Sequence, residues 1–503
     1  MNIGFLPLDE RPCNFKFPQY IARIAGVELI LPPKEILSRK RTPADLKAID
    51  EWLERESDNF DALVLSIDMF TYGGLIASRI SQASTEESVE RLEKIRDIKL
   101  KHRDLPIYAF NIIMRTSNSN NNEEEKEYWK DYGMLLFQYS ELTHKVKLFN
   151  REEDKQLLHE VERNIPEEII KDYLNGRERN HKVNLALIDL VKENIVDFAL
   201  LTQDDASPYG FPAMEQKELR AKIREGRVQS KVIIYPGADE VGMLLIARAV
   251  NVKEGVKPIF KADFSSVNGP HIITRYEDRP LFEGIKGQIN AVGGVLVDSI
   301  SLAGIELLVN TPAIEQGEAY LFYNMDKVEG PARNLLSLEQ IGRYCTEVLN
   351  MPVVLADVAY ANGADLELIE LLEETGFVEN LTCYAGWNTS GNTLGTVIAA
   401  GSAWISGSEI EDCEMALREF REVRLIDDWL YQAKVRTDVI EELKSRGINP
   451  WQLEDVEMAR IMVEEKLKEE VEKRSEEIFP LKIKRIDLPW NRLFEIDIHF
   501  EEK

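Results

Sequence analysis

Carboxylates, guanidiniums, amides and one phenol follow five short apolar runs in the first half of the sequence. They are Asp9, Glu10 and Arg11; Asp68, Tyr72 and Arg79; Asn111 and Arg115; Asp204 and Asp205; and Asp239 and Glu240. A single carboxylate at such a place is explained by capping of a helix N-terminus. Five groups in succession favour one shared site, because the carboxyl ends of parallel strands meet at one edge of a sheet, where ligands bind.

These five groups are rich in carboxylates and contain none of the six histidines of the chain. A nucleophilic triad built on histidine is therefore not expected. Two carboxyl groups that face one scissile bond can take different roles. Burial or a like charge raises the pKa of one, which then donates a proton, and the other stays ionised as base or nucleophile. We expect the catalytic carboxylates among the following residues, with the first three ranked highest: Asp204, Asp205, Asp239, Glu240, Asp68 and Asp9.

The remaining polar residues at these strand ends are expected to bind the substrate. They are Glu10, Arg11, Tyr72, Arg79, Asn111 and Arg115. A guanidinium can hold a substrate or a carboxylate through two parallel hydrogen bonds. Structural ion pairs are the alternative role for the three arginines.

A second set of polar residues follows apolar runs in the second half of the chain. Asp357 and Asn362 come after the run at 353–355, and Trp387, Asn388 and Asn392 come after the run at 381–384. An aromatic face covers the C–H groups of a sugar while amides bond its hydroxyls, so these residues are also expected to bind the substrate. The alternative is a tight, capped turn with a tryptophan in the core.

Common cofactor and nucleophile motifs are missing from the sequence. It contains no GxxxxGK[ST] loop, no GxGxxG after a strand, no GxSxG and no HExxH. Their absence speaks against nucleotide-driven, dinucleotide-dependent, serine-esterase and zincin chemistry. We expect no cofactor and no metal ligands. A divalent cation on the same carboxylates stays an alternative, since Mg²⁺, Mn²⁺ and Ca²⁺ prefer oxygen ligands.

Short β-branched runs alternate with longer helical patterns, which predicts a parallel α/β architecture. The first series of predicted strands covers residues 3–8, 27–31, 62–67, 107–113, 146–149, 198–202 and 232–235, and the second covers 259–260, 295–297, 306–309, 353–355 and 381–384. Helical patterns predominate from residue 407, and one at 451–475 is amphipathic. Two alternating runs at 481–486 and 493–498 predict a closing hairpin or an added sheet edge.

At about 150 residues per domain, a chain of 503 residues is typical of a multidomain protein. We predict an N-terminal α/β domain at 1–255 that carries the acidic groups. Its sheet is expected to be Rossmann-like or flavodoxin-like, with a barrel as the alternative. A second, smaller Rossmann-like domain is predicted at 256–406, and a mainly helical region with closing β-strands at 407–503.

The composition limits the possible partners. Lysines and arginines number 62 against 89 aspartates and glutamates, so the formal net charge is −27. An acidic surface speaks against binding of nucleic acid or anionic membranes. The sequence has neither an apolar run long enough to span a membrane nor the features of a secretory signal. Its four cysteines stand far apart and are expected to be reduced and buried. We expect a cytoplasmic protein, and its oligomeric state stays open.

Seven motifs occur in order along the chain: DERPxN (9–14), DMFTYGGL (68–75), QDDA (203–206), GADE (237–240), LADVAYANGAD (355–365), AGWNTSGNTLGT (385–396) and LPWNRLFEID (488–497). Together they resemble the domain-of-unknown-function family 4127, a bacterial family of similar length. The resemblance spans nearly the whole chain and implies an enzyme-like bacterial protein. The resemblance does not indicate an activity.

The leading hypothesis is a cytoplasmic hydrolase of a glycoside or an amino-sugar-containing substrate, with paired carboxylates as acid and as base or nucleophile. Two alternatives stay open. One is a metal-dependent amide or phosphoester hydrolase that uses the same carboxylates, and the other is a non-catalytic sugar-binding protein. The expected partner is a small, carbohydrate-like molecule.

Overall fold

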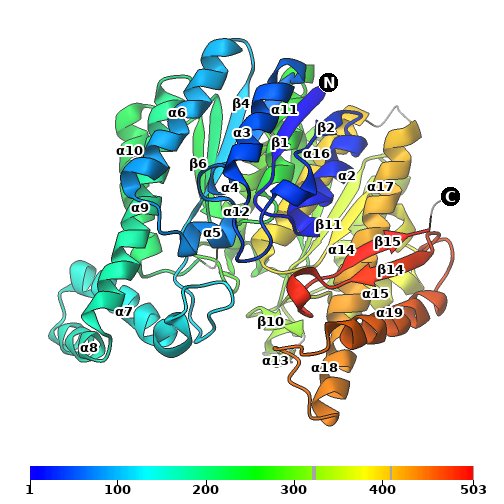
Figure 1. The fold of residues 1–503 in the computed structure, drawn as a ribbon. Coiled ribbons are helices and arrows are strands. Elements are labelled where there is room, and N and C mark those ends of the chain that lie inside the picture. The colour runs from blue at the N-terminus through cyan, green and yellow to red at the C-terminus, as the bar shows by residue number, and fades with distance from the viewer. Residues whose placement is uncertain (205, 320–324, 408–410, 502–503) are drawn as a thin grey trace. The chain divides into compact units, whose positions relative to one another are not determined.

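A computed structural model describes residues 1–204, 206–319, 325–407 and 411–501. The chain divides into two compact units, and each is made of several segments (Figure 1). Unit 1 comprises Met1–Glu10, Glu28–Leu245 and Tyr276–Asp278, and unit 2 comprises Arg11–Val27, Ile246–Arg275 and Arg279–Lys503. The chain therefore leaves unit 1 directly after Glu10 and returns to it at Glu28.

Unit 1 is built on a six-stranded parallel sheet. Its strands, in spatial order, are β2 (Glu28–Ile30), β1 (Asn2–Leu6), β3 (Ala62–Ser66), β4 (Ile107–Ile113), β5 (Phe198–Gln203) and β6 (Val232–Pro236). Every residue of β3, β4 and β5 is buried, as expected of a parallel sheet covered on both faces. Because all strands run the same way, their carboxyl ends lie at one edge, and the order of the strands reverses between β1 and β3.

Helices connect these strands. They are α3 (Leu46–Glu56), α4 (Ile67–Tyr72), α5 (Leu75–Ile80), α6 (Thr85–Lys101), α7 (Trp129–Phe149), α8 (Glu152–Arg163), α9 (Glu167–Lys192), α10 (Phe211–Gly226) and α11 (Val241–Glu254), the last of which contains the division between the units. Helices α7 and α8 pack side by side (Figure 1). The short helices α4 and α5 directly follow β3, so their side chains stay close to the carboxyl edge of the sheet.

Unit 2 contains a five-stranded parallel sheet with the same pattern of strand order. The strands are β8 (Val295–Leu296), β7 (Ile259–Phe264), β9 (Ile305–Asn310), β11 (Val353–Asp357) and β13 (Cys383–Ala385). In both sheets the second strand of the chain lies outside the first, and the later strands follow on the other side, which is the flavodoxin-like order. Two short strands, β10 (Gly317–Glu318) and β12 (Tyr360–Ala361), pair beside it.

The helices of unit 2 include two that precede the long unit 1 segment. These are α1 (Pro12–Phe15) and α2 (Phe17–Ile24); the others are α12 (Leu281–Ala291), α13 (Met325–Val328), α14 (Leu335–Glu347), α15 (Leu366–Glu374), α16 (Ser390–Gly407), α17 (Glu411–Arg424), α18 (Arg436–Ser445) and α19 (Val456–Glu472). An eleven-residue π-helix (Leu425–Val435) joins α17 to α18. Strands β14 (Ile483–Asp487) and β15 (Asp497–Phe500) form an antiparallel hairpin beside α19 (Figure 1).

The predicted parallel α/β architecture is confirmed, and so is the closing hairpin. The barrel alternative does not describe unit 1, whose described strands form an open sheet with β2 and β6 at its edges. The strand predicted at 146–149 is wrong, because these residues form the last turn of α7. A short apolar run does not distinguish a strand from the end of a buried helix. The four cysteines are buried, as expected, and none of the described helices is both long and apolar enough to cross a membrane.

Close packing of α14 on the unit 2 sheet requires a glycine. A Cβ on Gly342 would lie 2.6 Å from Phe377 Cζ and 2.7 Å from Leu308 Cδ1, whereas a Cβ on Gly284, in α12, would meet nothing within 4 Å. We predict that Gly342→Ala lowers the free energy of unfolding by about 1–3 kcal/mol through overpacking.

The matched variant Gly284→Ala should raise the free energy of unfolding by about 0.5–1 kcal/mol, because alanine favours the helix without a clash. Urea unfolding of both variants, followed by circular dichroism, measures the two changes. Equal effects of the two substitutions would contradict the packing argument.

Candidate functional site

The carboxyl edge of the unit 1 sheet gathers most of the predicted catalytic residues. Asp68 is the second residue of α4, directly after β3, and Asp204 follows β5. Asp239 and Glu240 stand between β6 and α11. We call the carboxylates Asp68, Asp204, Asp239 and Glu240, together with the guanidiniums of Arg79 and Arg115, the acidic edge. Asp205 lies outside the described residues.

Two guanidinium groups hold Asp204. Arg79 Nη2 donates to Asp204 Oδ2 at 2.6 Å, and Arg115 Nη1 lies 3.5 Å from the same oxygen. Both arginines also contact Glu124 Oε2, at 3.1 and 3.0 Å, and Arg115 Nε donates to Glu125 Oε1 at 2.9 Å. The Arg79 side chain is only 2% exposed and that of Asp204 is 19% exposed. Asp204 is therefore a salt-bridged carboxylate that solvent can still reach.

Asp68 is a buried carboxyl group beside this ion-pair network. Its Oδ2 accepts a hydrogen bond from the backbone N–H of Ile112 at 2.9 Å, and the residue is 1% exposed. The pKa of Asp68 is raised to about 7, mainly by burial; the negative charge of Asp204 contributes to this rise, and Arg79 opposes it. At neutral pH a substantial fraction of Asp68 thus carries a proton.

Glu240 is a second buried carboxyl group at this edge. Its Oε2 accepts from the backbone N–H of Ala238 at 2.9 Å. A Cβ on Gly237 would lie 2.0 Å from Glu240 Oε1, and φ of this glycine is 153°, so only glycine fits there. Burial raises the pKa of Glu240 to about 8, and the charges of Asp239 and Asp204 add to the shift. Glu240 is therefore mostly protonated at neutral pH.

Several buried polar atoms of β5, β6 and the turn after β6 have no hydrogen-bond partner among the described residues. They are Thr202 Oγ1, Gln203 Nε2, Tyr235 Oη and Glu240 Oε1. Buried polar groups in folded proteins nearly always have a partner. Of these residues, Thr202 and Tyr235 are partners in the sheet and Tyr235 is an electrostatic neighbour of Glu240, so water or a ligand is expected to complete the hydrogen bonding on this side of the strands.

Two other predicted residues of unit 1 follow β1. Asp9 is buried at 1% exposure. Glu10 accepts hydrogen bonds from Ser38 Oγ at 2.8 Å and from the backbone N–H of Lys40 at 2.9 Å. These contacts fix the loop at residues 38–40, so Glu10 has a structural role in unit 1.

Tyr72 and Asn111 also make contacts of a structural kind. The guanidinium of Arg179 lies 5.0 Å from the centre of the Tyr72 ring, and burial raises the pKa of this phenol to about 12. Asn111 Nδ2 donates to Asn184 Oδ1 at 2.8 Å, which joins β4 to α9. The negative charge of Asp68 adds to the pKa shift of Tyr72, so Tyr72 is an electrostatic neighbour of the acidic edge.

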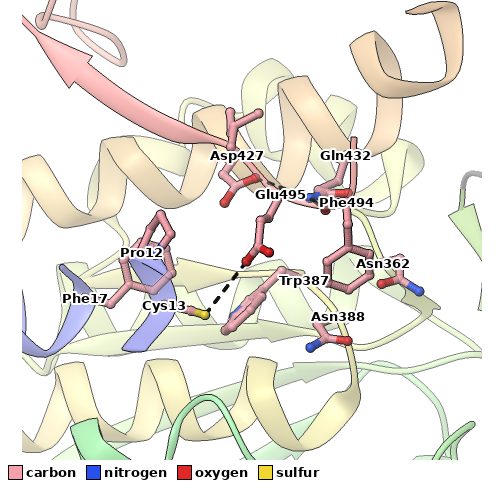
Figure 2. A pocket seen from close by; sticks show the side chains of 11 residues that line it. Pro12, Cys13, Phe17, Asn362, Trp387, Asn388, Asp427, Gln432, Phe494 and Glu495 are labelled. Atoms are coloured by element: carbon pink, nitrogen blue, oxygen red, sulfur yellow. Dashed lines mark hydrogen bonds between the residues drawn. The ribbon is translucent and has the colours of Figure 1, made fainter. Parts of the chain in front are cut away.

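The remaining predicted residues belong to unit 2. Asn362, Trp387 and Asn388 line a pocket of this unit, shown in Figure 2. Asn392 lies in the first turn of α16, where its backbone N–H donates to Thr389 Oγ1 at 3.3 Å. Arg11, predicted at the end of β1 beside the acidic groups, lies 3.8 Å from Glu495. Both residues belong to unit 2.

Asp357 anchors a buried network at the end of β11. Asp357 Oδ1 accepts from Asn310 Nδ2 at 2.8 Å. Asp357 Oδ2 accepts from the backbone N–H of Asp365 at 2.7 Å and from Tyr384 Oη at 3.0 Å. Burial raises the pKa of Asp357 to about 6, while the hydrogen bonds from Asn310 and Tyr384 oppose the shift. With both carboxylate oxygens engaged, Asp357 holds the loop after β11 in place.

Sequence reasoning missed polar residues in both units. Glu124 and Glu125 lie in a loop that the sequence marks only as polar. Asp427 and Gln432 stand inside the π-helix, and no motif identified them. Glu495 lies within the LPWNRLFEID motif, so the motif itself is the signal that could have found it. No group of three or more His, Cys, Asp and Glu side chains in the described part of the chain is arranged to hold a metal ion.

Comparison with known proteins identifies the family. The family model described as "Protein of unknown function (DUF4127)" matches residues 3–499, and the resemblance indicated by the sequence motifs is thereby confirmed. A search of curated proteins gives no match.

The raised pKa of Glu240 predicts a pH dependence of stability. Between its ordinary value of 4.5 and about 8, folded Glu240 keeps its proton while the unfolded chain loses it. Its contribution to stability is thus fully present below about pH 4.5 and is lost as the pH rises to 8, with a limiting slope of about 1.4 kcal/mol per pH unit. We predict that the stability advantage of the native protein over Glu240→Gln shrinks from pH 5 to pH 8.

Urea unfolding at the two pH values measures this difference. Glu160→Gln, on the exposed side of α8, serves as the control and should show no such trend. The free energy of unfolding of the native protein minus that of Glu240→Gln is the quantity to compare. If this difference stays constant or grows with pH, Glu240 is ionised in the folded protein.

Proposed function

Because the chain belongs to the family described as proteins of unknown function (DUF4127), whose description assigns no activity, we propose a function from the acidic edge. The protein is a hydrolase of a glycoside or an amino-sugar-containing substrate, with paired carboxyl groups as its acid and its base or nucleophile. The predicted cytoplasmic location, the bacterial origin and the lack of a cofactor belong to the same proposal.

One observation carries the proposal. Asp204 is the common electrostatic neighbour of two protonated carboxyl groups, since its charge raises the pKa of both Asp68 and Glu240. Asp204 itself stays salt-bridged to Arg79 and Arg115. A buried carboxyl group with a raised pKa beside a salt-bridged carboxylate is an arrangement that acid–base catalysis uses.

The proposal assigns a role to each group. Glu240, whose Oε1 has no partner among the described residues, donates its proton to the leaving-group oxygen. Asp204, the more exposed carboxylate, attacks the anomeric carbon or activates a water molecule for that attack. Arg79 and Arg115 orient Asp204, while Asp68 and Asp239 tune the charge around it. A glycosidic bond suits this set because its transition state carries positive charge, which a carboxylate stabilises.

Loss of the Asp204 charge is expected to abolish most of the activity. We predict that Asp204→Asn lowers kcat/KM on aryl glycosides by about 100-fold or more, for every leaving group tested. Asp50→Asn is the matched control, because Asp50 also pairs with an arginine in unit 1, Arg91, at 2.8 Å. Full activity of Asp204→Asn, or an equal loss in Asp50→Asn, would contradict the proposed role.

The role of Glu240 as proton donor predicts a dependence on the leaving group. Glu240→Gln should lower kcat/KM by about 100-fold or more for a phenyl glycoside, whose leaving oxygen needs a proton. For the 2,4-dinitrophenyl glycoside of the same sugar, which leaves without protonation, the loss should be smaller than about tenfold.

A purely structural role of Glu240 would reduce the turnover of both substrates alike. The native protein should also lose activity on the phenyl glycoside as the pH rises through about 8 and Glu240 ionises. Its activity on the 2,4-dinitrophenyl glycoside should not fall in this pH range. Parallel pH profiles for the two substrates would argue against Glu240 as the acid.

A further inference from the structure

Arg79 and Arg115 hold Asp204 from positions that their own elements support poorly. Arg79 lies in the last turn of α5, a helix of six residues, and Arg115 lies two residues after the end of β4. An isolated helix as short as α5 is unstable in water. Yet both guanidiniums reach the same oxygen of Asp204, at 2.6 and 3.5 Å. Another element must therefore fix the main chain at both positions.

Arg179 of α9 holds the end of α5. Its Nη2 donates to the carbonyl of Ser78 and its Nη1 to the carbonyl of Ser81, both at 2.7 Å. Asn180 Nδ2 donates to the carbonyl of Ser78 as well, at 3.0 Å. The last carbonyls of a helix have no partner within it, and a cation there also interacts favourably with the helix dipole. The main chain that carries Arg79 is thus fixed on both sides of this residue.

Arg177, on the same helix, holds the segment after β4. Its Nη2 donates to the carbonyl of Met114 at 2.7 Å, and its Nη1 donates to that of Arg115 at 3.0 Å. Glu215 of α10 in turn fixes this guanidinium through two hydrogen bonds, from Nε at 2.9 Å and from Nη2 at 2.8 Å. Arg177 is 3% exposed. The main chain of Arg115 is therefore tied to α9.

Helix α9 contacts both segments because of the spacing of its polar residues (Figure 1). Arg177, Asn180 and Asn184 follow one another at intervals of three and four residues, which places them on one face of the helix. Asn184 Oδ1 accepts from Asn111 Nδ2 of β4 at 2.8 Å, so this face lies on the strand. One helix of 26 residues thus supports the main chain of both arginines that hold Asp204.

The charge of Arg179 argues that its geometry matters. Arg179 is 4% exposed, and every oxygen that it reaches among the described residues belongs to a backbone carbonyl or to the side-chain amide of Asn180. Its guanidinium also lies 5.0 Å from the ring centre of Tyr72. A buried charge without an opposite charge beside it is costly. What arginine offers in return is a planar fork that bonds two carbonyls at once.

We propose that Arg177 and Arg179 are positioning residues of the acidic edge. Through the main chain at Arg115 and Arg79 they make the two guanidiniums converge on Asp204. Neither is bonded to Asp204 itself, whose ion-pair partners among the described residues are Arg79 and Arg115. The catalytic meaning of this positioning rests on the proposed function, in which Asp204 is the reacting carboxylate.

A double-mutant cycle tests the positioning without any turnover. Arg179→Lys keeps the positive charge and loses the planar fork, and Asp204→Asn removes the charge that the two guanidiniums hold. Residues without shared partners normally change stability independently. We expect coupling instead: the loss in the folding equilibrium constant caused by Arg179→Lys should be about threefold or more smaller in the Asp204→Asn host than in the native protein, because the ion pair that it serves is missing there. Arg177→Lys should behave alike in urea unfolding.

Lys99→Met is the control for this cycle. Lys99 Nζ donates to the carbonyl of Leu105 at 2.7 Å, before the first residue of β4 and so at the opposite edge of the same sheet. Its effect should be equal in the two hosts. If Arg179→Lys does not fold, Asn180→Ala, which removes one donor to the carbonyl of Ser78, takes its place. Equal effects of an arginine variant in both hosts would overturn the positioning role of that arginine.

Kinetics on an aryl glycoside test what the positioning does for catalysis. Arg177→Lys and Arg179→Lys should each lower kcat, calculated per folded chain, by about tenfold or more and change KM by less than about twofold, because a displaced carboxylate weakens transition-state stabilisation and leaves substrate binding intact. Lys99→Met should change neither constant. An unchanged kcat, or a change in KM alone, would overturn the role in catalysis.

The two arms separate this proposal from the proposed function. Coupling in the cycle, in a protein that turns over no glycoside, would support the positioning of Asp204 and contradict the hydrolysis. Additivity in the cycle, in a protein whose turnover depends on Asp204, would overturn the positioning and leave the hydrolysis standing.

Discussion

Two buried guanidinium groups hold the salt-bridged carboxylates of this protein. Arg79 in unit 1 bridges Asp204 and Glu124, and Arg424 in unit 2 bridges Asp427 and Asp428. Removing an ion from water costs several kcal/mol, and only a well-placed opposite charge offsets this cost. Each arginine is nearly inaccessible to solvent and pairs with more than one carboxylate. Loss of either guanidinium would leave its carboxylates with less compensation; in unit 1, Arg115 would still pair with Asp204.

At the acidic edge, guanidinium groups compensate the charge of some carboxyl groups and not of others, and this difference sets the chemistry of the site. The guanidiniums reach Asp204, whereas Asp68 and Glu240 lie deeper, where burial outweighs the available hydrogen bonds and raises the pKa of each. Asp68 accepts a backbone hydrogen bond from Ile112, and Glu240 accepts one from Ala238. The few donors that reach these groups do not replace the water that a carboxylate loses. The same edge therefore holds ionised and protonated carboxyl groups at one pH.

The sequence predicted the elements and residues that follow from local patterns. The strand at 107–113 has the predicted bounds, and Asp68, Asp204 and Glu240 were expected together because parallel strands end at one edge. Nothing in the DERP motif signals that the chain changes units after Glu10, so the sequence did not indicate that Arg11 belongs to unit 2. Glu124 and Glu125 were missed because a polar loop gives no indication of which side chains turn inward. These failures concern long-range placement, which periodicity does not encode.

The π-helix was beyond sequence reasoning for a different physical reason. Helix prediction rests on a 3.6-residue period, and a run such as Leu425–Val435 satisfies that period about as well as the wider one. Tertiary packing selects the wider helix: Trp429, Leu430 and Tyr431 are fully buried in the core of unit 2 while Asp427 and Gln432 face the pocket. Each left-handed non-glycine residue nearby costs about 1–3 kcal/mol. A core of this size can offset such costs.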